Sequence, residues 1–253
     1  MSLLVVGSVA YDSVSTGAGA RDDALGGSAT YFSVASSFFT NVSLVAVVGK
    51  DFLESDKNKL LNHGINISNL DIATGNTFRW KGVYDSSDVN IRETLDTQLN
   101  VFETFDPLLS NENKQSDFLF LANIDPKLQM KTLNQMTERP KVVALDTMNF
   151  WIDDHKQPLT DIIEKVDILF MDNKEIASFT GESNVIKAAK KITQMGPSTV
   201  VIKKGEHGVL MFNQGDIFTA PALPIENVID PTGAGDSFAG GFMGYISKTN
   251  DIS

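Results

Sequence analysis

One stretch near the C-terminus combines small residues with a carboxylate in a spacing that suits phosphate chemistry. It is Ile229–Gly241, with the sequence Ile-Asp-Pro-Thr-Gly-Ala-Gly-Asp-Ser-Phe-Ala-Gly-Gly. Gly233, Ala234 and Gly235 allow a backbone turn to approach a ligand closely, and the apolar run Phe238–Ile246 predicts a buried helix directly afterwards. A turn that opens a helix presents unpaired N–H groups and the positive end of the helix dipole, so this stretch predicts an anion site.

Asp236 lies in the first turn of this predicted helix, where its charge would repel a bound anion. The carboxylate suits such a site if it takes a proton from a nucleophile that attacks a phosphate held beside it. The alternative, from spacing alone, is an ordinary Gly-rich loop in which Asp236 is only a helix-start residue.

The composition restricts the class of protein. Of the 253 residues, 42% are hydrophobic and 21% are charged, which is typical of one large globular domain. The net charge of −11 disfavours binding to nucleic acid or to anionic membranes. The absence of cysteine excludes disulfides, zinc–thiolate sites and Cys nucleophiles. The N-terminal apolar run is short and lacks a basic flank, so we expect a cytoplasmic protein.

Short apolar runs alternate with helix-like segments along most of the chain. This alternation predicts a mostly parallel sheet covered by helices on both faces. The predicted strands are Leu3–Val6, Val42–Val48, Phe118–Leu121, Val142–Leu145, Ile168–Met171, Val200–Ile202 and Val209–Phe212, and the predicted helices are Ser28–Phe39, Phe52–Asn62, Leu128–Met136, Leu159–Val166 and Val185–Met195.

Two regions interrupt the alternation. Ser13–Leu25 is polar and Gly-rich, and Thr74–Val101 contains the strand-like pieces Thr77–Tyr84 and Val89–Leu95 around a polar turn at Asp85–Asp88. The two regions would pair into a small sheet outside the main layer, and such a sheet would form a lid over an active site. The alternative is a pair of irregular surface loops.

Polar residues follow several of the predicted strands. Ligands of open α/β sheets bind at the carboxyl ends of the strands, so these positions favour a site at that edge. Asp146 is equally well explained as a turn or cap residue. Asp172 and Glu175, three apart, would act through water on a Mg²⁺ ion that bridges phosphates, or would only complement a helix N-terminus. The full set is Asp12, Asn123, Asp125, Asp146, Asp172, Glu175, Lys203 and Gly205.

Together these motifs resemble the ribokinase/PfkB family of carbohydrate and nucleoside kinases, in the right order and along almost the whole chain. Asp230–Gly241 resembles the C-terminal signature of the family, which is long and specific. The resemblance implies a single ribokinase-like domain over residues 1–253, an αβα sandwich with a mostly parallel central sheet and a small β-sheet lid. The lid would comprise approximately residues 13–25 and 74–101.

The resemblance also implies transfer of the γ-phosphate of ATP to a hydroxymethyl group of a sugar or nucleoside, with Mg²⁺ as cofactor. A monovalent cation and a homodimer formed through the lid stay open. The implied roles are a base at Asp236 with an anion hole at Gly233, Ala234 and Gly235; substrate contacts at Asp12, Gly26, Gly27 and Asn123; nucleotide contacts at Lys203, Gly205, Gly208 and Thr232; and a metal site near Glu175 and Asp172.

Some positions depart from the family pattern. Ala10 and Tyr31 stand where ribokinases carry Asn residues that contact the sugar, which argues against ribose and leaves a nucleoside open. Phe150 stands near a customary Arg, and Asp172 stands where Asn is usual. The chain ends soon after the signature helix, so the resemblance predicts a C-terminally shortened piece. The alternative functions are a non-catalytic sugar- or nucleotide-binding regulatory protein and a vitamin-precursor kinase, a class that commonly lacks the lid.

Overall fold

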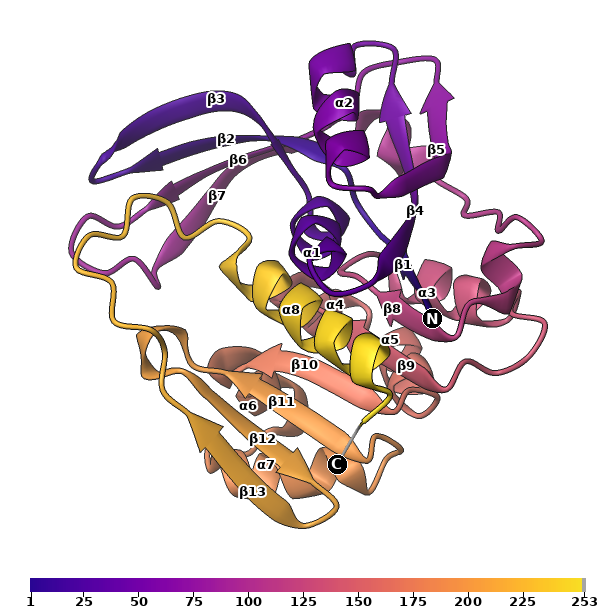
Figure 1. Ribbon diagram of the computed structural model, residues 1–253. Helices are drawn as coiled ribbons and strands as arrows, with labels where there is room; N and C mark the ends of the chain where they lie inside the picture. Colours follow the sequence, from indigo (N-terminus) through magenta and orange to yellow (C-terminus); the bar gives the residue numbers. More distant parts are fainter. Residues whose placement is uncertain (252–253) are drawn as a thin grey trace.

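The computed structural model describes residues 1–251, and within them it contains one large and one small β-sheet (Figure 1). Seven strands of the large sheet run parallel, and the two strands at one edge pair antiparallel. In spatial order they are β13 (Asp216–Ala220), β12 (Val209–Asn213), β11 (Thr199–Lys203), β10 (Ile168–Asp172), β9 (Val142–Asp146), β8 (Phe118–Leu121), β1 (Ser2–Val6), β4 (Asn41–Gly49) and β5 (Asn66–Ala73).

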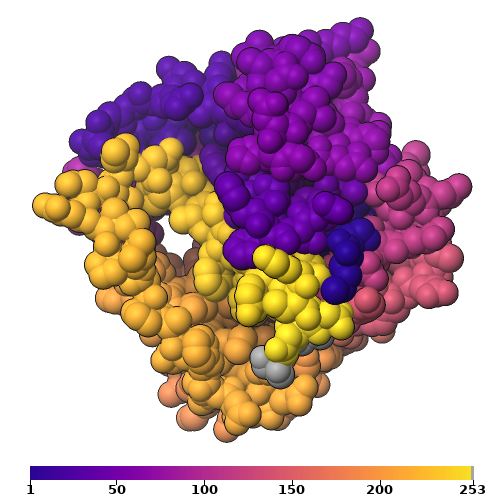
Figure 2. All heavy atoms as spheres, viewed as in Figure 1, coloured from indigo at the N-terminus to yellow at the C-terminus, as the bar shows by residue number. Residues whose placement is uncertain are grey.

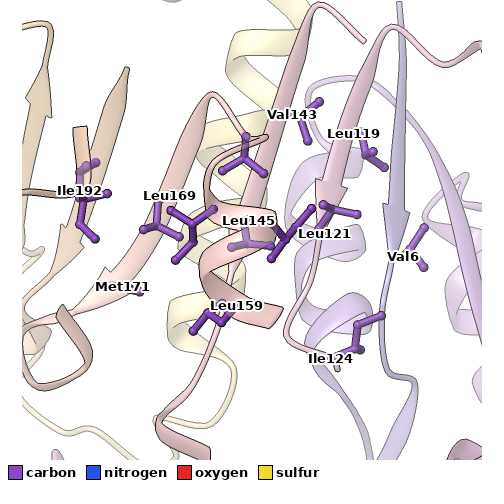
Figure 3. Close-up of a cluster of buried hydrophobic side chains, with 14 of the residues drawn as sticks. Val6, Leu119, Leu121, Ile124, Val143, Leu145, Leu159, Leu169, Met171 and Ile192 are labelled. Atoms are coloured by element: carbon purple, nitrogen blue, oxygen red, sulfur yellow. The ribbon is translucent and has the colours of Figure 1, made fainter. Parts of the chain in front are cut away.

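Buried strands with apolar side chains on both faces divide the core into two layers. In β1, Leu4 and Val6 belong to one buried cluster, and Leu3 and Val5 belong to the other. Figure 3 shows part of the first cluster, where Leu145 and Leu169 of the sheet lie near Leu159 of a covering helix. That face is covered by α3 (Pro126–Leu133), α4 (Asn149–Asp154), α5 (Lys156–Ile163), α6 (Asn173–Thr180) and α7 (Val185–Thr193).

The opposite face is covered by α1 (Ser28–Ser37), α2 (Glu54–Asn62) and α8 (Ala234–Thr249). Helices α1 and α8 lie side by side (Figure 1). Two glycines one turn apart allow this approach: a Cβ added at Gly240 would lie 2.3 Å from the carbonyl oxygen of Phe32, and one at Gly244 would lie 3.0 Å from Cα of Ser36. The close contact fixes the start of α8 relative to α1.

The small sheet has the order β3 (Gly19–Gly26), β2 (Ala10–Thr16), β6 (Phe78–Tyr84) and β7 (Arg92–Gln98). The first and third pairings are antiparallel, and β2 and β6 run parallel. The two irregular regions of the sequence therefore do pair with each other. The sheet lies at one end of the molecule, above the start of α8 (Figure 1).

The predicted αβα sandwich with a mostly parallel sheet and a small accessory sheet is confirmed. The seven predicted strands and five predicted helices are present with shifts of a few residues at their ends. The sequence reasoning missed β5, β13 and the short α4, and it raised α6 only as one reading of Asp172 and Glu175. The strands β5 and β13 carry mostly exposed or half-exposed side chains and lack a strong apolar run. The remaining helical segments are the 3₁₀ turns η1 (Asn100–Thr104), η2 (Asn113–Gln115) and η3 (Gly205–His207). No helix within residues 1–251 is long and apolar enough to cross a membrane.

We expect Gly240→Ala to lower the free energy of unfolding by about 1–3 kcal/mol, because the new methyl group meets the α1 backbone and forces the helices apart. Gly241→Ala is the matched control, because no atom lies within 4 Å of a Cβ at that position. It should raise the free energy of unfolding by about 0.5–1 kcal/mol through its better helix propensity. Urea unfolding of the three proteins measures both effects, and equal stability of the two variants would contradict this packing account.

Candidate active site

The first turn of α8 has the geometry of an anion site. Gly233 is the N-cap residue, with φ of 73°, and no side chain caps the helix. The amides of Gly235 and Asp236 therefore lie in a helix start whose N–H groups are open to a ligand. The loop of residues 221–233 leads into this turn, and Figure 2 shows a hollow between the loop and the body of the molecule beside the start of α8.

The side chain of Tyr31 on α1 packs against this turn. A Cβ at Gly233 would lie 2.3 Å from Cγ of Tyr31, so the aromatic ring packs directly against the glycine backbone. The Tyr31 hydroxyl donates a hydrogen bond of 3.2 Å to Oδ2 of Asp12. One side chain therefore spans from the predicted substrate carboxylate to the predicted anion hole.

Asp12 is buried at the start of the small sheet, with 5% of its surface exposed. The glycine pair makes room for it: a Cβ at Gly26 would lie 2.0 Å from Oδ2 of Asp12, and a Cβ at Gly27, where φ is 94°, would lie 2.5 Å from the carbonyl oxygen of Ser8. Burial raises the pKa of Asp12 to about 6, although the hydrogen bond from Tyr31 lowers it. The structure thus brings Asp12, Gly26 and Gly27 together as one unit.

Asp236 lies in the first turn of α8. Burial and the charge of Asp146 raise its pKa to about 7, whereas the ammonium of Lys203 works in the opposite direction. Asp12 also raises the pKa of Asp236, and Arg92 on β7 lowers it. A carboxylate with a pKa close to neutral is suited to accept a proton during a reaction.

Lys203 is the last residue of β11 and lies next to the same helix start. Its Nζ donates to Oδ1 and Oδ2 of Asp146 at 2.9 and 3.0 Å. A Cβ at Gly235 would lie 3.3 Å from that Nζ. Burial alone would lower the pKa of Lys203, but the carboxylates of Asp146, Glu175 and Asp236 raise it above its ordinary value, so the ammonium stays charged.

Asp172 and Glu175 form a capping box at the start of α6. Oδ1 of Asp172 accepts from the amides of Lys174 and Glu175 at 2.7 Å, and Oε2 of Glu175 accepts from the amide of Asp172 at 2.6 Å. Burial raises the pKa of Glu175 to about 8, with Lys203 opposing this shift. The capping role that the sequence left open is therefore present, and a metal role stays a prediction.

The predicted nucleotide turn connects β11 to β12. Gly205 and Gly208 have φ of 56° and 83°, and a Cβ at Gly208 would lie 2.0 Å from the carbonyl oxygen of Ala220, so both positions require glycine. The hairpin of the small sheet reaches this turn, because Nδ2 of Asn90 donates to Oε2 of Glu206 at 2.7 Å. On the α8 side, Oγ1 of Thr232 donates to the Tyr84 hydroxyl at 3.2 Å.

Asn123 and Asp125 have local partners. Oδ1 of Asn123 accepts from Nε1 of Trp151 at 2.9 Å, and Oδ1 of Asp125 caps α3 by accepting from the amide of Lys127 at 2.8 Å. A substrate contact from Asn123 stays a prediction. Sequence reasoning missed the Asp146–Lys203 pair and the Tyr31–Asp12 bond, although it had flagged all four positions singly.

The comparisons with known proteins decide the family. The model of the pfkB family carbohydrate kinases matches residues 3–253. The chain belongs to the pfkB family of carbohydrate kinases. A cytidine kinase of Thermococcus kodakarensis is 29% identical over 255 residues, which covers 98% of this chain and 89% of that protein.

Solved structures of the pfkB fold agree with this assignment. The nucleoside kinase of Methanocaldococcus jannaschii, an archaeal member of the ribokinase family, superposes with a TM-score of 0.78 at 22% identity, over 99% of this chain and 86% of that one. An E. coli protein crystallised with ATP and Mg²⁺ gives a TM-score of 0.79 at 16% identity, over 99% of this chain and 87% of that one. The chain is thus a pfkB-family kinase with the ribokinase fold.

We expect Asp236→Asn to stabilise this kinase at alkaline pH. The pKa of Asp236 is raised on folding from 3.8 to about 7, so folding disfavours its charge. The resulting loss of folding free energy is absent below pH 4, where Asp236 is protonated in both states, grows as the pH rises and is complete above pH 7. Asn removes it, so the variant should gain about 1–2 kcal/mol at pH 8, after allowance for partial solvent exposure, and nothing at pH 4. Urea unfolding at both pH values measures this, and a wild type of equal or greater stability at pH 8 would contradict the raised pKa.

Proposed function

We propose that this pfkB-family kinase transfers the γ-phosphate of ATP to a hydroxymethyl group of a nucleoside, with Asp236 as the base. The observation that carries the proposal is the placement of Asp236 in the uncapped first turn of α8, beside Lys203 and within electrostatic range of Asp12. The similarity to a cytidine kinase over nearly the whole chain favours a nucleoside acceptor. A neutral sugar is the second candidate, because the matching family model is that of carbohydrate kinases.

The chemistry follows from this arrangement. The acceptor hydroxyl attacks the γ-phosphorus, the bond from that phosphorus to the β,γ-bridging oxygen breaks, and the bond electrons leave with ADP. The hydroxyl proton passes to the Asp236 carboxylate as the new P–O bond forms, because a carboxylate is too weak a base to remove it beforehand. The amides of the α8 start stabilise the charge on the transferred group.

Asp12 is the proposed acceptor contact. Its buried carboxylate accepts from the Tyr31 hydroxyl and from the backbone of Gly27, and its two oxygens have further lone pairs that would accept from a hydroxyl of the substrate. The packing of Tyr31 against Gly233 fixes the distance between that hydroxyl site and the anion hole. Such alignment is the larger part of catalysis in phosphoryl transfer.

The residues at β10 and α6 suit Mg²⁺ in an indirect role. Within residues 1–251, no group of three His, Cys, Asp or Glu side chains forms a metal cage. Asp172 and Glu175 already accept hydrogen bonds from backbone amides, so they would hold the ion through water molecules. The phosphates of ATP would supply the direct ligands. When bound, Mg²⁺ would neutralise charge on the transferring phosphates.

Purified protein, incubated with MgATP and a panel of cytidine, other nucleosides, ribose and fructose, should form a phosphorylated nucleoside. Asp236→Asn should lower kcat about 10²–10⁴-fold while ATP affinity is retained. Asp216→Asn is the matched control, because Asp216 is exposed on β13, and it should keep wild-type turnover. Turnover of Asp236→Asn within tenfold of wild type would exclude Asp236 as the base, and turnover only of sugars would exclude the nucleoside.

The pH profile gives a second test. Asp236 must be ionised to accept a proton, and its pKa is about 7, so kcat/KM should fall about tenfold per pH unit below pH 7. Below pH 6 the slope should steepen, because Asp12, with a pKa of about 6, is protonated as well. Initial rates at subsaturating acceptor between pH 4.5 and 8.5 measure this profile, and a constant rate down to pH 5 would contradict it.

A further inference from the structure

The ion pair between Lys203 and Asp146 joins two strands that are not neighbours. Lys203 ends β11 and Asp146 ends β9, and β10 lies between them in the sheet. The lysine side chain therefore crosses the end of β10, where Glu175 of the following helix lies with its pKa responding to the Lys203 charge. Asp146 is 2% exposed, and the Lys203 side chain is 17% exposed.

A buried ion pair of this kind is weak evidence of stabilisation. Removal of two charges from water costs several kcal/mol per ion, and apolar residues in their place are often as stable. Apolar side chains form the core on both sides of these strands, so the fold offers no packing reason for charges at this point. The pair is better explained by what the ammonium faces.

The ammonium faces the start of α8. A lysine has three N–H donors, and two of them are directed at the two oxygens of Asp146. A Cβ added at Gly235 would lie 3.3 Å from Nζ, so the ammonium adjoins the backbone of the anion-hole turn. Its third donor is thus available to an anion bound at that turn.

The charge balance of the site also requires a cation there. The carboxylates of Asp146, Glu175 and Asp236 all act on Lys203, and Asp12 acts on Asp236. Without the lysine, whichever of these four side chains are ionised would repel a terminal phosphate with no nearby ammonium to oppose them. Arg92 acts on Asp12 and Asp236, but it is an exposed residue of the small sheet with its guanidinium over Trp80.

We propose that Lys203 binds the γ-phosphate of ATP at the start of α8, and that Asp146 is the positioning residue that holds its ammonium there. This inference rests on the proposed function and assigns the cation of its phosphate site. Lys203 thus acts on the transferred group, in addition to lining a nucleotide pocket.

The test compares the dissociation constants of MgATP and MgADP, measured by calorimetry, because only ATP carries the γ-phosphate. Lys203→Met alone leaves Asp146 buried and unpaired and is expected to unfold more easily. The double variant Asp146→Asn/Lys203→Met removes both charges and keeps the packing. In this double variant we expect the preference for ATP over ADP to fall about tenfold and kcat to fall about 10²-fold. Lys187→Met, an exposed lysine on α7, is the control and should leave both unchanged.

Asp146→Asn alone tests the positioning role. This variant keeps the ammonium of Lys203 but removes the carboxylate that positions it, so kcat should fall at least tenfold. Lys203→Arg keeps both the positive charge and the Asp146 partner, so it should retain more activity than the double variant. A folded double variant with the wild-type ATP preference and kcat would overturn the assignment of Lys203, and wild-type kcat in Asp146→Asn would overturn that of Asp146. A wild type that binds no ATP would overturn the proposed function itself. If the wild type does transfer phosphate, the results of the variants test only the assignment of Lys203 and Asp146.

Discussion

The electrostatic balance at the start of α8 is the constraint on which the rest of the site depends. Asp236, Asp146 and Glu175 are brought together with the single ammonium of Lys203, close to helix N–H groups that carry partial positive charge. Burial raises the pKa values of Asp236 and Glu175, and the neighbouring carboxylates add to this because they disfavour each other's ionised forms. A group that is costly to ionise is one that readily holds a proton, and the proposed chemistry uses that property.

The topology of the sheet produces this crowding. Parallel strands end at one edge, so β9, β10 and β11 deliver Asp146, Asp172 and Lys203 to the same edge of the sheet from distant parts of the sequence. The glycines of α8 then allow the helix to pack closely on α1, whose Tyr31 supports the anion-hole turn and bonds to Asp12. The acceptor side and the phosphate side are therefore connected through one aromatic ring.

Much of this was predictable from the sequence, for identifiable reasons. Apolar runs such as Phe118–Leu121 are buried on both faces and predict strands, and the Gly233–Asp236 motif predicts its own helix start. Pairings across the sheet were not predictable, because nothing local to Asp146 or Lys203 indicates the other. The capping box of Asp172 and Glu175 has the spacing of a metal-site carboxylate pair as well, so sequence alone could not choose between them.

The most direct test of this account is a titration of the Asp236 side chain itself, by ¹³C NMR of protein labelled at the aspartate carboxyls, with Asp236→Asn used to assign the signal. The account predicts a carboxyl that titrates near pH 7 in the free enzyme, because burial and the charge of Asp146 raise the pKa more than the ammonium of Lys203 lowers it. An Asp236 signal that titrates near pH 4, as an exposed aspartate does, would contradict the central claim that this helix start holds a half-buried, proton-accepting carboxylate.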